Sequence, residues 1–316
     1  MNRITKRGLL AGAGAALVAN TFARASLAAQ ADACPSDVKF GGDAKVRTQR
    51  LYADGRFGQV HFTISQPEAP TTKTPLVCMH TSPNSGVEFK IFQKVMARDR
   101  VVLCPDTPGF GSSDAPPKAP TIPDYSGAIA DALRKLGYGP QKKVDLLGTH
   151  TGAMVGADMA VTQPDLVRKV IISSIVYFED EKARAEMKAR TTGPTPILTD
   201  AELVPNAFRS SVINGQKDVS PERRLEVFGE RMRAGYNSYW GPDAVFAYDL
   251  APTLKKIGQP TLMLVVRDTL SANTRLAAKL PPHVTVIDIE NRTRMTSWDL
   301  EPDLVACEVA SFLDKA

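Results

Sequence analysis

The sequence contains few cysteines: four in 316 residues, at positions 34, 78, 104 and 307. Domains that depend on disulfide bonds carry a much higher share of cysteine, so we expect no disulfide framework in a chain of this length. Cys78 and Cys104 lie inside apolar, strand-like stretches, where a buried free thiol is the ordinary outcome. A bond between these two is the alternative in an oxidising compartment.

Long apolar runs and nucleotide-binding loops are also missing. Beyond the first 29 residues, no uninterrupted apolar run reaches the roughly 18 residues expected of a membrane-spanning helix. We therefore expect a mature protein that is not embedded in a membrane. Neither a G-x-G-x-x-G loop nor a G-K-T/S loop occurs, so the sequence predicts no organic cofactor.

Excess positive charge is confined to the start of the chain. The formal net charge is +5, but residues 1–29 hold Arg3, Lys6, Arg7 and Arg24 and no acidic residue, and the rest has 35 basic against 34 acidic residues. A nucleic-acid or anionic-membrane partner would need clustered basic residues on the mature domain. We therefore expect no nucleic-acid partner and no anionic-membrane partner.

Residues 1–29 have the pattern of an export signal. Basic residues precede an apolar stretch of 12 residues, 8–19, which is too short to span a bilayer. Small residues that suit signal cleavage follow at Ala25, Ala29 and Ala31. Thr5-Lys6-Arg7-Gly8-Leu9-Leu10 is similar to a twin-arginine signal with lysine in the first basic place, and ordinary Sec export is the alternative. The sequence predicts a periplasmic or secreted protein.

Residues 30–316 read as one domain in which strands alternate with helices. Residues 45–65 alternate in polarity and predict an antiparallel strand pair that turns at Asp54-Gly55. Short unbroken apolar runs, typical of parallel strands buried on both faces, then recur with helix-length segments between them. This order predicts the α/β class, with a mostly parallel sheet flanked by helices. The runs are 76–79, 101–104, 144–147, 170–172, 262–266 and 284–287.

The helices expected around this sheet are 88–98, 125–136, 153–163, 271–280 and 302–313. Residues 176–258 contain no strand-like run and are rich in charge and proline. We expect this segment to form a helical cap inserted between the sixth and seventh strands. Its predicted helices are 180–190, 200–213, 221–234 and 242–248.

The most informative motif is Gly148-Thr149-His150-Thr151-Gly152 after an apolar strand. Glycines at these places allow a sharp strand-to-helix turn that lifts the central residue beside the amides of a helix N-terminus. Together with His80-Thr81-Ser82-Pro83-Asn84 and the segment 105–116 (Pro-Asp-Thr-Pro-Gly-Phe-Gly-Ser-Ser-Asp-Ala-Pro), this sequence resembles the α/β-hydrolase fold family, in its epoxide-hydrolase-like and haloperoxidase-like branch. The resemblance covers roughly residue 51 to the C-terminus.

The catalytic triad implied by the resemblance is incomplete. Asp268, after the strand 262–266, matches the triad acid, but the elbow carries His150 where the family has Ser, Asp or Cys. The loop 290–298, where the catalytic histidine is expected near Met295, contains no histidine. The resemblance also implies an oxyanion site formed by the loop of His80, Thr81 and Ser82 together with the amide of Thr151. A Ser-His-Asp mechanism is therefore not predicted.

Three hypotheses follow. In the first, the protein is a hydrolase-like enzyme acting on a small ester, lactone or related carbonyl compound, with His150 as nucleophile or general base and Asp268 orienting it. In the second, the fold is retained as a catalytically inactive protein that binds a small ligand. In the third, His80 and His150 hold a metal with Asp106 or Asp268. Of the three, we favour the enzyme, with no metal.

The remaining candidates have ordinary structural explanations. Asp106 and Asp114 are expected to fix loops through backbone amides. His61 and His283 are expected at the surface or at a sheet edge. Tyr236, Tyr239 and Trp240 are aromatic residues that suit either a substrate pocket or packing of the cap on the sheet.

Overall fold

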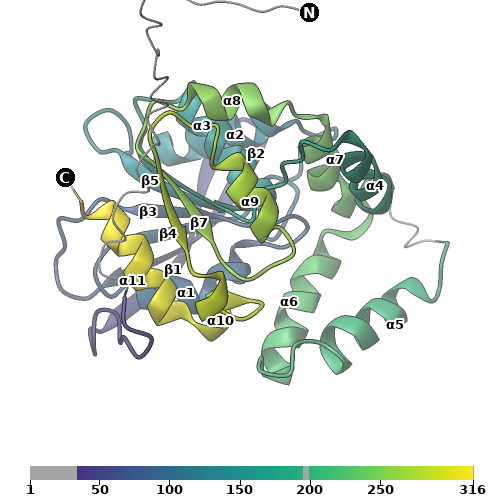
Figure 1. Cartoon of the computed structure of the whole chain (residues 1–316), viewed down its shortest axis with the longest axis horizontal. Helices are drawn as coiled ribbons and strands as arrows, with labels where there is room; N and C mark the ends of the chain where they lie inside the picture. The colour runs from purple at the N-terminus through teal and green to yellow at the C-terminus, as the bar shows by residue number, and fades with distance from the viewer. Residues whose placement is uncertain (1–33, 195–198, 316) are drawn as a thin grey trace, which may run out of the picture. The chain divides into compact units, whose positions relative to one another are not determined.

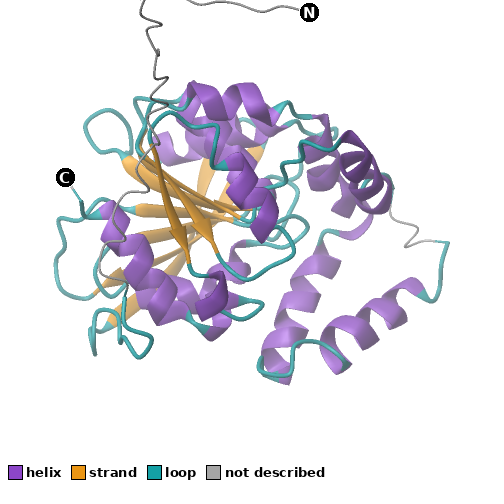
Figure 2. Cartoon of the chain, in the orientation of Figure 1, coloured by secondary structure: helices purple, strands orange, loops and turns teal. Residues whose placement is uncertain are grey.

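The computed structural model describes residues 34–194 and 199–315, and the expected export signal at 1–29 lies outside these ranges. Eight strands form a single sheet in the order β1-β2-β4-β3-β5-β6-β7-β8 (Figures 1 and 2). β2 pairs antiparallel with β1 on one side and with β4 on the other. All the remaining pairs, among β3 to β8, are parallel. The strands are β1 (Val46–Gly55), β2 (Gly58–Pro67), β3 (Leu76–Met79), β4 (Val102–Pro105), β5 (Val144–Thr149), β6 (Val167–Ser173), β7 (Thr261–Val265) and β8 (Val284–Asp288).

Burial explains why these short runs form strands. Every residue of β3, β4, β5 and β7 is buried, as the unbroken apolar runs predict for strands covered on both faces. β8 alternates between exposed and half-buried residues because it is the edge of the sheet. The prediction of an α/β fold with a mostly parallel sheet is confirmed.

Two apolar cores flank the sheet. The first core lies between one face of the sheet and the helices α2 and α3, with α7 and α8 packed against α3. The second core lies between the opposite face and α1, α10 and α11. Figure 1 shows α2, α3 and α8 together on one side and α1, α10 and α11 on the other. These helices are α1 (Lys90–Met96), α2 (Ile122–Lys135), α3 (Thr151–Thr162), α7 (Trp240–Ala247), α8 (Leu250–Lys256), α10 (Ser297–Leu300) and α11 (Pro302–Leu313).

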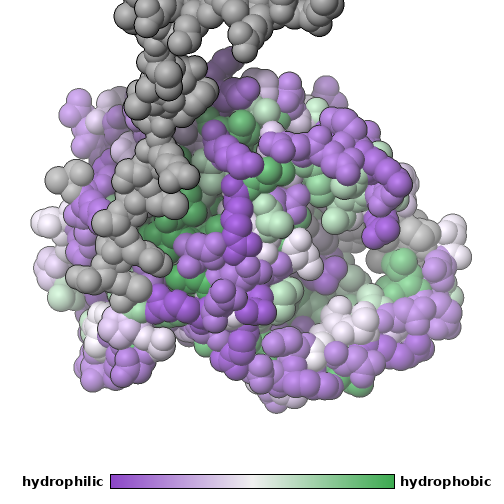
Figure 3. Space-filling view, viewed as in Figure 1, coloured by the Kyte–Doolittle hydropathy of each residue, from purple (hydrophilic) through white to green (hydrophobic). Residues whose placement is uncertain are grey.

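The chain between β6 and β7 is helical where it is described. Its first helix, α4, has no buried residue and forms part of the hydrophilic surface in Figure 3, and α6 and α5 extend away from the sheet in Figure 2. Besides α7 and α8, this part contains α4 (Glu181–Thr191), α5 (Leu203–Phe208), the π-helix η2 (Arg209–Ile213), α6 (Pro221–Arg233) and the 3-10 helix η3 (Gly235–Tyr239). No helix of the described chain is long and apolar enough to cross a membrane.

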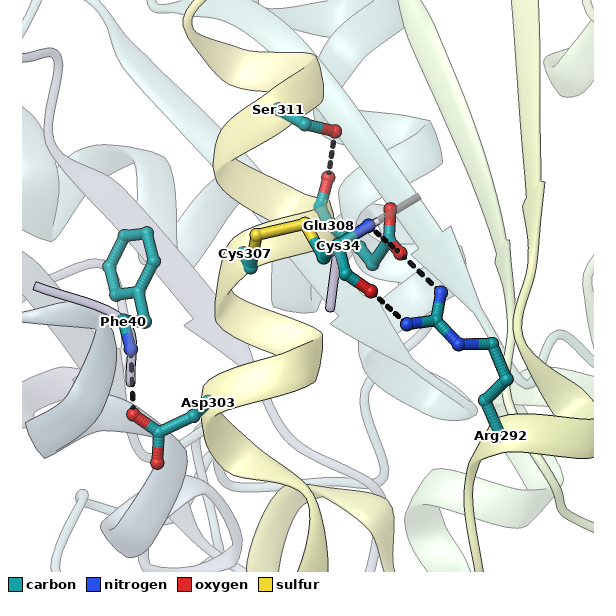
Figure 4. The surroundings of a disulfide bond; sticks show 7 residues. All are labelled: Cys34, Phe40, Arg292, Asp303, Cys307, Glu308 and Ser311. Carbon is teal, nitrogen blue, oxygen red and sulfur yellow. Dashed lines mark hydrogen bonds and ion pairs between the residues drawn. A yellow bond between two sulfur atoms is a disulfide. The ribbon is translucent and has the colours of Figure 1, made fainter. Parts of the chain in front are cut away.

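Two expectations about single residues are wrong. Cys34 and Cys307 form a disulfide that ties the start of the described chain to α11 (Figure 4), whereas Cys78 and Cys104 are buried free thiols as expected. The Cys34 backbone N–H also donates to Glu308, at 3.2 Å. His61 is buried rather than exposed because its Nδ1 pairs with the Asp106 carboxylate at 2.8 Å.

Candidate active site

The site is built on the sharp turn between β5 and α3. His150 is the residue before α3, with φ 51° and ψ −115°, a conformation that costs a residue with a Cβ about 1–3 kcal/mol. The flanking glycines make this turn possible, since a Cβ at Gly152 would overlap the Met79 carbonyl and one at Gly148 would overlap the Gly152 backbone. The two glycines of the motif therefore hold an imidazole at the elbow position.

Strand register places two further groups beside this turn. β5 pairs Thr149 with Ser173 of β6, which in turn pairs with Leu264 of β7. His150, Ser174 and Asp268 follow these three parallel strands in the chain. They therefore lie together at the carboxyl ends of the strands. The Ser174 hydroxyl donates to the Asp268 carboxylate, which also accepts the Leu270 backbone N–H at 2.7 Å.

Two residues with positive φ lie at the carboxyl ends of these strands. Among the described residues, only three non-glycine residues have positive φ: His150 at 51°, Ser174 at 50° and Thr296 at 64°. Thr296 follows Met295, near which the resemblance expects the catalytic histidine, and Met295 is 40% exposed. His150 and Ser174 therefore combine strained backbone with a place beside Asp268, an arrangement often found at functional sites.

The His150 imidazole is half-buried. Burial lowers its pKa, and the negative charge of Asp268 opposes that shift without cancelling it. The ring is therefore neutral at neutral pH and has a lone pair available. The first amides of α3, those of Thr151 and Gly152, precede the hydrogen bonds of the helix and provide donors at its N-terminus.

The loop after β3 lies against these amides. The Ser82 N–H donates to the Thr151 hydroxyl at 3.4 Å, which is longer than a normal N–H···O hydrogen bond. The Ser82 hydroxyl is buried and has no partner within the described ranges. A Cβ on Gly241 of α7 would overlap this side chain, so α7 lies directly over the loop. The loop of Ser82 therefore lies beside the N-terminus of α3, and the oxyanion role that the resemblance implies for it stays a prediction.

His80 ties this loop to the loop after β4. Its Nδ1 pairs with the Thr81 carbonyl at 2.9 Å, and its Nε2 accepts the Thr107 N–H at 2.9 Å. Burial lowers the pKa of His80, consistent with a neutral ring that donates from Nδ1. Both ring nitrogens are thus engaged, and within the described ranges no group of three or more His, Cys, Asp or Glu side chains could hold a metal ion. The metal hypothesis gains no support here.

Asp106 and Asp114 fix loops, as expected. Asp106 accepts the backbone N–H groups of Gly86 and Ser112, each at 2.8 Å, in addition to its pair with His61. Burial alone would raise the pKa of Asp106, but these donors outweigh it and the pKa lies below its usual value. Asp114 accepts the Gln59 N–H at 2.7 Å.

The sequence analysis did not find Glu88 as a site residue. Its carboxylate accepts the Thr81 N–H at 2.7 Å and the Thr81 hydroxyl at 3.1 Å, so it holds the middle of the oxyanion loop. Burial raises the pKa of Glu88 to about 7, against the lowering effect of its Thr81 hydrogen bonds. In the sequence, Glu88 is simply an acidic residue at the start of a predicted helix, which gives no signal of this role.

Arg223 of α6 also escaped the sequence analysis. Although α6 extends from the sheet, this guanidinium is buried and donates to both oxygens of Asp299 and to the carbonyls of Val87 and Glu88. The contacts attach α6 to the loop that carries Glu88 and to α10. Of the three aromatic residues considered, Trp240 is buried in the core, whereas Tyr236 is 48% exposed and packs edge-on against Tyr239.

Comparisons with known proteins agree with this architecture. The sequence profile of the α/β hydrolase fold family matches residues 74–291, and the chain belongs to this family. The chain is 26% identical to (E)-2-((N-methylformamido)methylene)succinate hydrolase of Acinetobacter baylyi over 200 residues, 62% of this chain and 74% of that protein. It is 28% identical to 3-hydroxybutyrate-oligomer hydrolase of Cupriavidus necator over 108 residues, 34% of this chain and only 36% of that protein.

Among solved structures, the enol-lactonase from Burkholderia xenovorans LB400 superposes with a TM-score of 0.62 at 21% identity, covering 84% of this chain and 100% of that chain. This likeness shows the fold. The mostly parallel sheet and the sharp turn after β5 match what the family resemblance implies from the sequence.

Proposed function

We propose that the protein is a hydrolase for a small ester, lactone or related carbonyl compound, with His150 as its nucleophile. The observation that carries this proposal is the conformation of His150, held at φ 51° and ψ −115° between two glycines that the surrounding backbone requires. A fold kept only for binding gains nothing from an imidazole in this strained place, because a glycine there would relieve the strain.

The chemistry follows from the neutral ring. An imidazole nitrogen attacks the carbonyl carbon with its lone pair, and the carbonyl oxygen takes up negative charge near the Thr151 and Ser82 amides. The C–O bond to the leaving group then breaks, and the departing oxygen takes the proton of the other ring nitrogen, relayed by water, which leaves a neutral acyl-imidazole. One water then attacks the acyl carbon, the acid departs, and a proton of that water returns to the ring nitrogen and restores the neutral imidazole. An imidazole needs no separate base to become nucleophilic, so the missing second histidine fits this mechanism.

We also propose that residues 176–258 act as a cap that selects the substrate. α7 lies over Ser82, and Arg223 attaches α6 to the loop of Glu88, so this segment contacts the oxyanion loop from two of its helices. The names of the relatives, which include an enol-lactonase and an N-methylformamido-methylene-succinate hydrolase, support a small carbonyl substrate.

Export remains part of the proposal. Residues 1–29 have the signal pattern described above, and the disulfide between Cys34 and Cys307 suits an oxidising compartment such as the periplasm or the exterior of the cell. A disulfide joining the start of the domain to its last helix would be kept reduced in most bacterial cytoplasms.

The test is hydrolysis of a panel of p-nitrophenyl esters and lactones by the purified protein. We expect turnover by the wild type and none by His150→Ala, with a melting temperature close to that of the wild type. His150→Gly, which relieves the strain at φ 51°, should also be inactive and should melt no lower than wild type. Full activity in either variant would refute the role of His150, and an inactive wild type across the panel would favour the ligand-binding alternative.

A further inference from the structure

A pocket of about 470 Å³ opens between the start of the inserted segment and its end. It is lined by the connection from β6 to α4, by the first part of α4 and by the connection from α7 to α8, with Met154 of α3 beneath. Met154 lies one helical turn beyond His150, but neither His150 nor Asp268 lines the pocket. This volume lies within the range of small-molecule sites, and the pocket is separate from the proposed catalytic group.

Aromatic side chains form much of its wall. Tyr177, Phe178 and Tyr248 are half-buried, and Phe246 is buried. The Tyr248 ring is fixed because its hydroxyl donates to Asp158 at 2.8 Å and pairs with Thr253 at 2.7 Å. The wall is therefore a built surface with an apolar body, not a gap between mobile polar side chains.

The Phe246 ring contacts a positively charged side chain, that of Arg184. The Arg184 guanidinium lies 5.9 Å from the centre of the Phe246 ring, and Arg184 donates to the Phe246 carbonyl at 2.7 Å. This arrangement has the geometry of a cation–π contact. One ring of the lining, that of Phe246, thus carries a positive charge on its face.

The rim of the pocket carries three exposed carboxylates, those of Glu179, Glu181 and Asp249. Within the described ranges, none of the three has a side-chain hydrogen bond or an ion pair, and Asp249 does not cap α8 although it precedes that helix. Arg184 is the one cation among the lining residues. Three negative groups against one positive group leave the pocket with a net negative charge.

We propose that this pocket binds an organic cation, an alkylated ammonium ion with an apolar body. The apolar part would lie against Met154 and the aromatic wall, and the ammonium would face Glu179 and Asp249 at the rim. A fully alkylated ammonium ion has no N–H group and needs no hydrogen-bond acceptor, and both aromatic faces and carboxylates attract it. The proposal concerns a site apart from His150 and does not depend on the proposed hydrolase activity.

The experiment compares choline with its neutral isostere 3,3-dimethylbutan-1-ol, by ligand-detected NMR and calorimetry on the full-length mature protein. We expect choline to bind at least about tenfold more tightly than the alcohol. Glu179→Gln/Asp249→Asn should weaken choline binding by at least about tenfold, whereas Glu186→Gln on the exposed surface of α4, outside the pocket lining, should leave it unchanged.

Binding of choline to His150→Ala should equal binding to the wild type, which separates this proposal from the hydrolase proposal. Equal affinity for choline and the alcohol, absence of choline binding at millimolar concentration, or unchanged binding by the double variant would each overturn the proposed cation site. Melting temperatures of the variants confirm that each is folded, because the substituted carboxylates are exposed and make no contact that the fold needs.

Discussion

At the scale of single residues, the proposed mechanism depends on the protonation of His150 under the charge of the Asp268 carboxylate. His150 must be neutral to attack a carbonyl, and burial favours the neutral ring by lowering its pKa. The charge of Asp268 works in the opposite direction and stabilises the protonated ring. The two effects together set the pH at which the enzyme loses activity on acidification.

The first prediction concerns this acid limb. Because the pKa of His150 is lowered from 6.5, kcat/KM of the wild type should rise with pH, and the midpoint of this rise should lie below pH 6.5. Asp268→Asn removes the opposing charge, so the limb should move to still lower pH. The measurement is the pH profile of kcat/KM, with Asp54→Asn on the exposed surface of β1 as a control outside the site. An acid limb that moves upward in Asp268→Asn would contradict the account.

Glu88 carries the second prediction. Its pKa is raised to about 7 in the folded protein, so the folded state holds a proton that the unfolded state releases near 4.5. The stability that the protonated carboxyl contributes is fully present below pH 4.5 and is lost as pH rises through about 7. Wild-type stability should therefore fall by up to about 3 kcal/mol across this window.

The measurement for Glu88 is the melting temperature between pH 4 and pH 8. Glu88→Gln keeps the shape and an acceptor for the Thr81 amide but cannot ionise, so its melting temperature should fall less over the same window than that of the wild type. Parallel curves for the two proteins would show that Glu88 does not titrate as described.

At the scale of elements, the β5–α3 turn depends on backbone packing that a Cβ would disrupt. Gly152→Ala places a methyl group on the Met79 carbonyl of β3, and the two backbones must separate to accommodate it. We expect a loss of at least about 2 kcal/mol. Gly229 of α6 has no heavy atom within 4 Å of its would-be Cβ and has a helical backbone, so Gly229→Ala should gain about 0.5–1 kcal/mol.

Chemical denaturation of both glycine variants provides the comparison. The opposite signs test the geometry directly, since both substitutions add the same methyl group. A Gly152→Ala protein as stable as the wild type would mean that the elbow does not pack against β3 as described.

The elements were predictable where local pattern decides them. Apolar runs located the parallel strands, and α11 spans Pro302–Leu313 as predicted because proline starts the helix and its apolar face is continuous. α8 was missed, since a seven-residue helix with Pro252 near its start shows no apolar period. The helix expected at 153–163 begins at Thr151, because the turn at His150 is sharper than the pattern indicates.

The site was predictable only in its motif residues. His150 and Asp268 follow buried strands in recognisable sequence contexts, and the sheet order brings them to one edge. The role of Glu88 depends on Thr81, and that of Arg223 depends on Asp299, partners that lie on other loops and elements. His61 was misplaced for the same reason, because its partner Asp106 follows a different strand. Contacts of this kind require the assembled fold.

At the scale of the whole molecule, the disulfide joins the two ends of the described chain. Cys34 and Cys307 are 273 residues apart, a separation over which no sequence pattern predicts pairing. Arg292 also binds the Cys34 carbonyl and the Glu308 carboxylate, so the start of the domain is attached to α11 by several contacts (Figure 4). Cross-linking a long loop restricts mainly the unfolded chain.

The disulfide prediction is a loss of about 2–4 kcal/mol on reduction or in Cys34→Ser/Cys307→Ser. Thermal unfolding with and without reductant is the measurement. The wild type should melt lower in reductant, and the double variant should not respond to it. A wild-type melting temperature that is insensitive to reductant would show that the bond contributes no stability.

The most direct test of the whole account is the identity of the group that becomes acylated. The wild type is mixed with a p-nitrophenyl ester, quenched during the first turnover and digested for peptide mapping by mass spectrometry. The account predicts the acyl group on the His150 imidazole, with none on the peptides of His150→Ala. Acylation of the Ser82, Thr149 or Thr151 hydroxyl, or steady turnover without any acyl-enzyme, would contradict it.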